Sequence, residues 1–179
     1  MDFPSIIQSI QDSAPAQWMR TSVKAMPFVE SLHVLAAATL FGTIFIVDLR
    51  LLGFPDTRRS FTAISREMLR LTWAAFFVAV IAGALMFAAN AHTYVGNTAF
   101  RLKMLALVAA GVNMTIFQGI TIRTVSAWDR DARPPLAGRV AGVLSILLWI
   151  SVIFFARWIG FTKGYDFSIP QDSHINFQF

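Results

Sequence analysis

The sequence predicts an all-α membrane protein, a bundle of four transmembrane helices. One observation is composition: 56% of the 179 residues are hydrophobic and 14% are charged, whereas a soluble domain carries about 25% charged residues. The other is run length, because four apolar stretches each reach the roughly 20 residues that a helix needs to cross a bilayer. The chain length suits a single membrane domain, residues 1–179.

The four predicted spans are bounded by residues that start or stop helices. Pro27 suits the first turn of a helix, where its missing N–H costs nothing. Gly53 is expected to end the first span, Asn97 and Thr98 to cap the third, and Pro134 to precede the fourth. The predicted spans are residues 27–52, 71–91, 99–122 and 136–159.

Three further segments lie outside the spans. Residues 1–26 and 60–70 mix apolar and polar side chains, which predicts short amphipathic helices lying on the membrane surface. Residues 164–179 are polar and are expected to form an extramembrane tail. Residues 1–12 lack the basic start of a cleavable signal peptide, so none is predicted.

The distribution of lysine and arginine predicts the orientation. Nine of these residues lie beside the first and third connections, and six lie on the opposite side. The excess of positive charge marks the cytoplasmic side, so both termini are expected outside. The nine are Arg50, Arg58, Arg59, Arg66, Arg70, Arg123, Arg130, Arg133 and Arg139, and the six are Arg20, Lys24, Arg101, Lys103, Arg157 and Lys163.

Composition and motifs argue against several classes of protein. The formal charge of +5 resides largely in short loops between apolar runs, where lipid headgroups explain it better than nucleic acid does. Cysteine is absent, which excludes disulfides and thiolate chemistry. The sequence has no phosphate-binding loop, no G-x-G-x-x-G and no H-E-x-x-H. An enzyme of hydrolytic type is therefore not expected.

Small residues recur four positions apart on every span, as helix packing in lipid requires. The main interpretation is packing within one four-helix bundle, and the alternative is dimerisation through Gly138 and Gly142. The small residues are Ala38 and Gly42; Ala75, Ala79 and Gly83; Ala106, Ala110, Gly111, Thr115 and Gly119; and Gly138 and Gly142.

An inner belt of ionisable residues (Asp48, Arg50, Arg123 and Arg139) lies near the cytoplasmic ends of the spans. Asp48 is expected to pair with one of these arginines, which would neutralise the charges and fix helix register. On the third span, Asn113 and Gln118 are expected to form hydrogen bonds between helices. These roles are structural.

An outer belt surrounds His33, the only histidine inside a span, since His92 and His174 fall in a loop and the tail. Glu30 and His33 share a helix face, three residues apart. His33 lies roughly 9 Å inside the first span, at a depth similar to that of two methionines on the second and third spans. The other members of the outer belt are Met86, Met104, Lys103, Arg101, Tyr94, Asn97 and Arg157.

Three interpretations of the outer belt follow. In the first, His33 is hydrogen-bonded to Glu30 or to a neighbouring helix and orders the bundle, with no cofactor. In the second, His33 is an axial ligand of haem b, opposite His92, Met86 or Met104, with Lys103 or Arg157 near the propionates. In the third, His33, Met86 and Met104 bind copper(I), which favours imidazole and thioether ligands. The second span lacks a histidine for a bis-histidine haem site.

The stretch from Glu30 through His33, followed by Asp48-Leu-Arg50-Leu-Leu-Gly53, resembles a family of small bacterial inner-membrane proteins, domain of unknown function 6644. Tyr94, Asn97, Phe100 to Lys103 and Asn113 extend the resemblance over most of the chain. It implies a four-span bundle in the bacterial inner membrane, without an assigned activity. Together with the charge distribution, this location predicts periplasmic termini. More distantly, the layout is similar to cytochrome b561-type and copper-resistance-type bundles, although Gln118 stands where relatives carry histidine.

These observations favour a small, non-catalytic membrane protein that acts as a structural, anchor or assembly subunit of a membrane complex. Its expected partners are the lipid bilayer and either further copies of itself or other membrane subunits. The alternative is a haem-linked electron-transfer protein or a copper(I)-binding protein that uses the outer belt.

Overall fold

The computed structural model of the chain describes residues 2–54, 60–129 and 134–162. Within this part every regular element is a helix, which confirms the predicted fold class. Four helices are long and apolar enough to cross a membrane. In chain order the elements are α1 (Phe3–Gln11), α2 (Ala14–Thr21), α3 (Ala25–Leu52), α4 (Phe61–Ala89), α5 (Ala91–Gly96), α6 (Thr98–Ile120), the 3₁₀ helix η1 (Thr121–Thr124), α7 (Val125–Trp128) and α8 (Leu136–Thr162).

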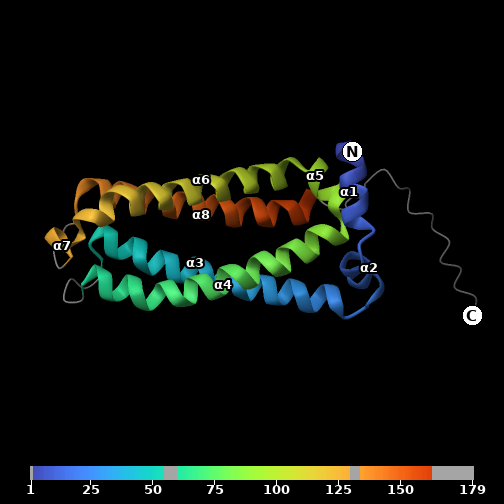
Figure 1. Cartoon of the computed structure of the whole chain (residues 1–179), viewed down its shortest axis with the longest axis horizontal. Helices are drawn as coiled ribbons and strands as arrows, with labels where there is room; N and C mark the ends of the chain where they lie inside the picture. The colour runs from blue at the N-terminus through green and yellow to red at the C-terminus, as the bar shows by residue number, and fades with distance from the viewer. Residues whose placement is uncertain (1, 55–59, 130–133, 163–179) are drawn as a thin grey trace, which may run out of the picture.

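The four long helices pack as neighbours in the order α4, α3, α8, α6 (Figure 1). Helix α3 packs on both α4 and α8, while α6 packs on α8. The short helices α1, α2 and α5 lie at one end of the long helices, which we call the α5 end, and α7 lies at the other, the α7 end. Because the connections alternate between these ends, Phe3 and Thr162 both lie at the α5 end.

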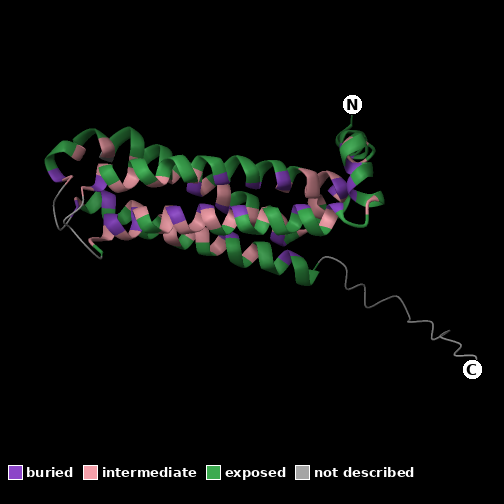
Figure 2. Ribbon diagram, turned by 90° about the horizontal axis from the view of Figure 1, so that it is seen from below, coloured by how far each residue is buried: buried purple, intermediate pink, exposed green. Residues whose placement is uncertain are grey.

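Much of the surface of the long helices is exposed (Figure 2). Many of the exposed residues have large apolar side chains. An exposed apolar surface of this extent is unusual for a soluble monomer, but lipid solvates it well. Together with the lengths of the four helices, this surface fits a membrane protein. Examples from each long helix are Val34, Leu35, Phe77, Ile81, Leu105, Val108, Leu147 and Phe154.

Most of the predicted helix boundaries lie close to those of the structure. Gly53 ends α3 with φ of 92°, a left-handed conformation that glycine adopts without strain. The side chain of Asn97 accepts a hydrogen bond from the N–H of Phe100 at 3.1 Å, so Asn97 caps α6 as expected. Residues 164–179, predicted as a tail, lie outside the described residues.

The predicted surface helix at residues 60–70 is wrong as a separate element. These residues form the first turns of α4, which begins after Ser60 and continues without a break to Ala89. An amphipathic turn at the end of a long helix has the same periodicity as a helix lying on the membrane. The sequence pattern therefore does not separate the two arrangements.

The small residues divide into those that pack within the chain and those that do not. Ala75 and Ala79 of α4 are buried, and so are Ala106 and Ala110 of α6. By contrast, a Cβ added at Gly42, Gly111 or Gly119 would meet nothing within 4 Å. Packing within the bundle is thus confirmed for only part of the predicted set.

The alternative of dimerisation through Gly138 and Gly142 is wrong for this arrangement, because both glycines are buried on α8. A Cβ added at Gly142 would lie 3.2 Å from the backbone oxygen of Asp48 and 3.3 Å from Cβ of Leu51. Gly142 therefore marks the close crossing of α8 and α3, and this face is covered within the chain.

Candidate functional site

His33 of α3 packs against the smallest residues of α4. A Cβ added at Gly83 would lie 3.1 Å from Cε1 of the imidazole. Nδ1 of His33 lies 2.9 Å from the backbone oxygen of Ala79. Because Gly83 has no side chain, the ring reaches the α4 backbone. His33 thus forms a hydrogen bond to the neighbouring helix, one of the two kinds of partner expected for it.

This hydrogen bond fixes the tautomer of His33. A carbonyl oxygen only accepts, so in the neutral ring Nδ1 carries the proton and Nε2 keeps its lone pair. Glu30 and Lys103 are the charged groups close enough to interact electrostatically with the ring. Lys103 is half-buried and belongs to α6, whereas Glu30 is exposed on α3. Charged groups of two helices, α3 and α6, therefore influence the ring through space.

The other predicted outer-belt ligands make contacts of their own. Nε2 of His92 lies 3.1 Å from Oε1 of Gln8, which joins α5 to α1. Met86 packs against an apolar cluster that contains Met19, Val29 and Ala82. Met104 is 44% exposed on the outside of α6.

Arg157 lies with its guanidinium carbon 5.1 Å from the ring centroid of Phe161, one turn further along α8. This is a cation–π contact, and Arg157 itself is exposed. Among the residues that the structure describes, no three histidine, aspartate or glutamate side chains form a cluster that could hold a metal ion.

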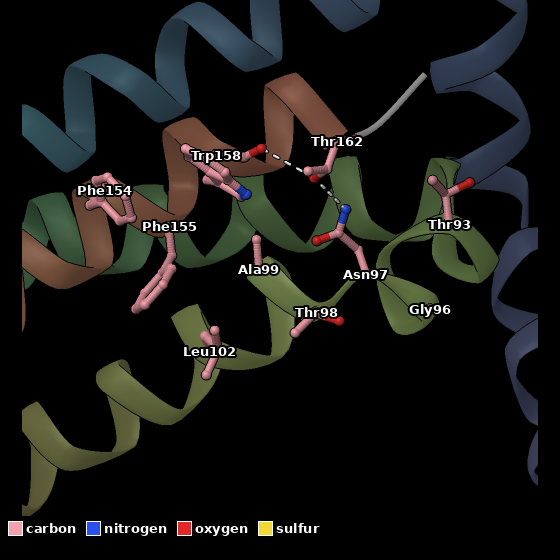
Figure 3. A pocket seen from close by; sticks show the side chains of 10 residues that line it. All are labelled: Thr93, Gly96, Asn97, Thr98, Ala99, Leu102, Phe154, Phe155, Trp158 and Thr162. Carbon is pink, nitrogen blue, oxygen red and sulfur yellow. Dashed lines mark hydrogen bonds between the residues drawn. The ribbon is translucent and has the colours of Figure 1, made fainter. Parts of the chain in front are cut away.

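A pocket of about 500 Å³ opens at the α5 end, between the start of α6 and the end of α8 (Figure 3). Phe154, Phe155 and Trp158 form its aromatic wall. At its polar edge the amide of Asn97 donates to the hydroxyl of Thr162 at 2.8 Å. This pocket was not predicted from the sequence, although the four-residue spacing of Phe154 and Trp158 is a signal for a shared aromatic face.

Asp48 in the inner belt has a serine partner. Its side chain is 6% exposed, and the hydroxyl of Ser145 on α8 donates a hydrogen bond to it. Oδ2 of Asp48 is buried and has no hydrogen-bond partner among the residues that the structure describes. The ion pair predicted between Asp48 and Arg50, Arg123 or Arg139 stays a prediction. Arg123 and Arg139 are exposed.

Arg50 is 1% exposed and donates to the backbone oxygen of Asp129 at 3.3 Å. The carboxylate of Asp129 accepts from the N–H of Thr62 at 2.8 Å and from its hydroxyl at 2.9 Å. Asp129 therefore caps the start of α4 from a position 67 residues away from Thr62. Asp129 was not predicted as a cap of α4, because the sequence pattern of a helix cap involves only residues close to the helix start.

The two side-chain amides of the third span, Asn113 and Gln118, lie in different environments. The side-chain amide of Asn113 donates to the backbone oxygen of Ala141 at 3.0 Å, which joins α6 to α8. Gln118 is exposed. In addition, the hydroxyls of Thr43 and Thr72 lie 2.8 Å apart between α3 and α4.

Residues 20–162 match the model of DUF6644, a family of unknown function. The chain belongs to this family. The match covers all four long helices of the structure and confirms the family resemblance drawn from the outer-belt and Asp48 motifs. No curated protein and no solved structure matches the chain. The more distant similarity to cytochrome b561-type and copper-resistance-type bundles stays a prediction.

Proposed function

We propose that this member of the DUF6644 family is a non-catalytic integral membrane protein, a structural, anchor or assembly subunit of a membrane complex. The observation that carries the proposal is the position of His33. Its ring lies over Gly83, and its Nδ1–H is bonded to the backbone oxygen of Ala79 at 2.9 Å. His33, the outer-belt residue that was the leading candidate for a cofactor ligand, thus serves to join α3 to α4.

The other polar side chains within the spans support the same role. Ser145 bonds Asp48 between α8 and α3, and Asn113 bonds Ala141 between α6 and α8. With His33 between α3 and α4, every neighbouring pair of long helices has a side-chain hydrogen bond. In lipid such bonds contribute about 0.6 kcal/mol on average, and they also fix helix register.

The proposal includes a location and partners. Arg50, Arg123 and Arg139 lie towards the α7 end, which supports a cytoplasmic position for that end and a periplasmic position for both termini. The family resemblance supports the bacterial inner membrane. The partners are the lipid bilayer and, through helix faces that pack on nothing within the chain, other membrane subunits or further copies.

The proposal is tested by the stability of His33 variants in detergent. The amide of glutamine can donate to the Ala79 oxygen, so His33→Gln should retain most of the stability, whereas His33→Leu should lose about 1 kcal/mol. Thr39→Leu is the matched control, because the Thr39 hydroxyl donates to the backbone oxygen of Leu35 in its own helix and, among the described residues, to no other helix. Equal losses for both His33 variants would contradict a hydrogen-bonding role.

A second candidate function follows from the other ring nitrogen. Histidines that bind metals commonly donate one N–H to a backbone carbonyl, which orients the other nitrogen toward the metal. His33 has this arrangement, with Nδ1 bound and the lone pair of Nε2 available. This favours an imidazole ligand to haem b or copper(I) as the alternative role, with Lys103 as the neighbouring cation.

A further inference from the structure

A groove of about 410 Å³ runs along the first turns of α8 at the α7 end. Its walls are apolar, and most of the lining side chains are open to the surroundings: Leu136 is 73% exposed and Leu147 is 56% exposed. The apolar lining consists of Leu136, Val140, Val143, Leu144 and Leu147 of α8 and Leu52 at the end of α3.

Among the described residues that line this groove, Arg139 is the charged one. It is exposed, and its guanidinium has no hydrogen bond or ion pair with any described residue. By contrast, Arg50 of the same belt is buried against Asp129. Arg139 also lies in the first turn of α8, where the helix dipole adds positive potential. The mouth of the groove therefore attracts an anion.

The groove extends from this cation along the helix axis. Arg139 and Leu147 are eight residues apart, which corresponds to about 12 Å along an α-helix. Helix α8 has 27 residues and is longer than the hydrocarbon core. Arg139 thus lies at headgroup level, and the apolar walls lie beside the acyl chains. A matching ligand has a negative group at one end and a hydrocarbon chain at the other.

We propose that this groove binds an anionic phospholipid, whose phosphate pairs with Arg139 and whose acyl chain lies along Val140, Leu144 and Leu147. A free phosphate would leave the apolar walls uncovered, and a zwitterionic lipid would bring no net charge to Arg139. Basic pockets beside transmembrane helices are known to hold anionic headgroups. The site lies at the opposite end of the molecule from His33 and does not depend on the role of that residue.

The test is native mass spectrometry of the purified full-length protein with equal concentrations of phosphatidylglycerol and phosphatidylcholine. The wild type should bind phosphatidylglycerol preferentially, and Arg139→Gln should reduce that preference about fivefold, the equivalent of one arginine near an anionic headgroup. Arg157→Gln is the matched control, because it removes an exposed arginine at the α5 end of the same helix. It should leave the preference unchanged.

A second variant tests the groove itself without changing charge. Leu144→Trp would fill the apolar wall and should lower phosphatidylglycerol binding, while thermal unfolding shows that the variant is folded. The proposal is overturned if Arg139→Gln keeps the full preference, or if Arg157→Gln lowers it equally. It is also overturned if Leu144→Trp leaves lipid binding intact, or if that variant converts a wild-type dimer to a monomer, since a second copy would then cover the groove.

Discussion

Gly142 of α8 lies against the backbone of Asp48 of α3, so closely that a Cβ at position 142 would be 3.2 Å from the Asp48 oxygen. This contact is the crossing point of the two layers of the molecule, α3 with α4 and α8 with α6. Close backbone approach of this kind drives helix association in lipid, where no hydrophobic force draws helices together.

Gly142→Ala should destabilise the protein by about 1–3 kcal/mol, because the added methyl group would lie closer to the Asp48 backbone than an ordinary van der Waals contact and α3 would have to shift. Gly111→Ala is the control, since a Cβ there would meet nothing within 4 Å. Alanine also favours a helix over glycine, so the control should keep or raise stability. Thermal unfolding in detergent measures both. Equal stability of the two variants would show that this crossing does not hold α3 and α8 together.

The bond between Asp48 and Ser145 makes a separate prediction. Ser145→Ala removes the hydroxyl that donates to a buried carboxylate and should cost about 1–3 kcal/mol. Asp48→Asn replaces one carboxyl oxygen with an amide group and weakens the acceptor, so Ser145→Ala should cost less in that background. A double-mutant cycle measures the coupling, which should exceed about 0.5 kcal/mol. Additive effects would mean that the two side chains do not interact.

The cap that Asp129 forms on α4 is testable at the α7 end. Asp129→Ala leaves the N–H of Thr62 without its acceptor and should cost about 0.5–2 kcal/mol. Asp129→Asn keeps one acceptor oxygen and should cost less. Amide hydrogen exchange at the first turn of α4 should increase in the alanine variant. Ser126→Ala, at an exposed position of α7, is the control and should leave exchange in α4 unchanged.

The proposed orientation is tested with single cysteines, because the natural chain has none. Gly96→Cys at the α5 end should react with a membrane-impermeant thiol reagent in intact spheroplasts. Ser126→Cys at the α7 end should react only after lysis. Both positions are exposed, so the difference reports on the side of the membrane. The reverse pattern would invert the orientation.

The fold could be predicted because it depends on local properties of the chain. Run length and hydrophobicity determine where a helix crosses a membrane, and Gly53 and Asn97 mark boundaries through their own backbone preferences. The start of α4 was harder to predict, because the amphipathic residues after Ser60 are compatible with either a surface helix or the end of a transmembrane helix. Only the packing of Phe61 against Trp128 and Phe117 distinguishes the two.

The polar partners could not be predicted, since they depend on which helices become neighbours. Arginine was the expected partner of Asp48 on charge alone, yet Ser145 faces it because α8 crosses α3 at Gly142. The cap supplied by Asp129 likewise depends on the tertiary structure, because Asp129 follows α7 and must lie beside the start of α4 to bond Thr62. For His33 the sequence predicted a hydrogen bond either to Glu30 or to a neighbouring helix. Gly83 of α4 leaves room for the imidazole ring, so the ring reaches the α4 backbone.

The central claim is that His33 joins α3 to α4 without carrying a cofactor, and the visible spectrum of the purified protein tests it most directly. A reduced-minus-oxidised spectrum, recorded with metal analysis of the same preparation, should show no haem band and no stoichiometric copper. The opposite result would be a haem band lost equally in His33→Gln and His33→Leu, or bound copper lost on replacing Met86 or Met104. Either finding would contradict the structural role and establish the imidazole as a ligand.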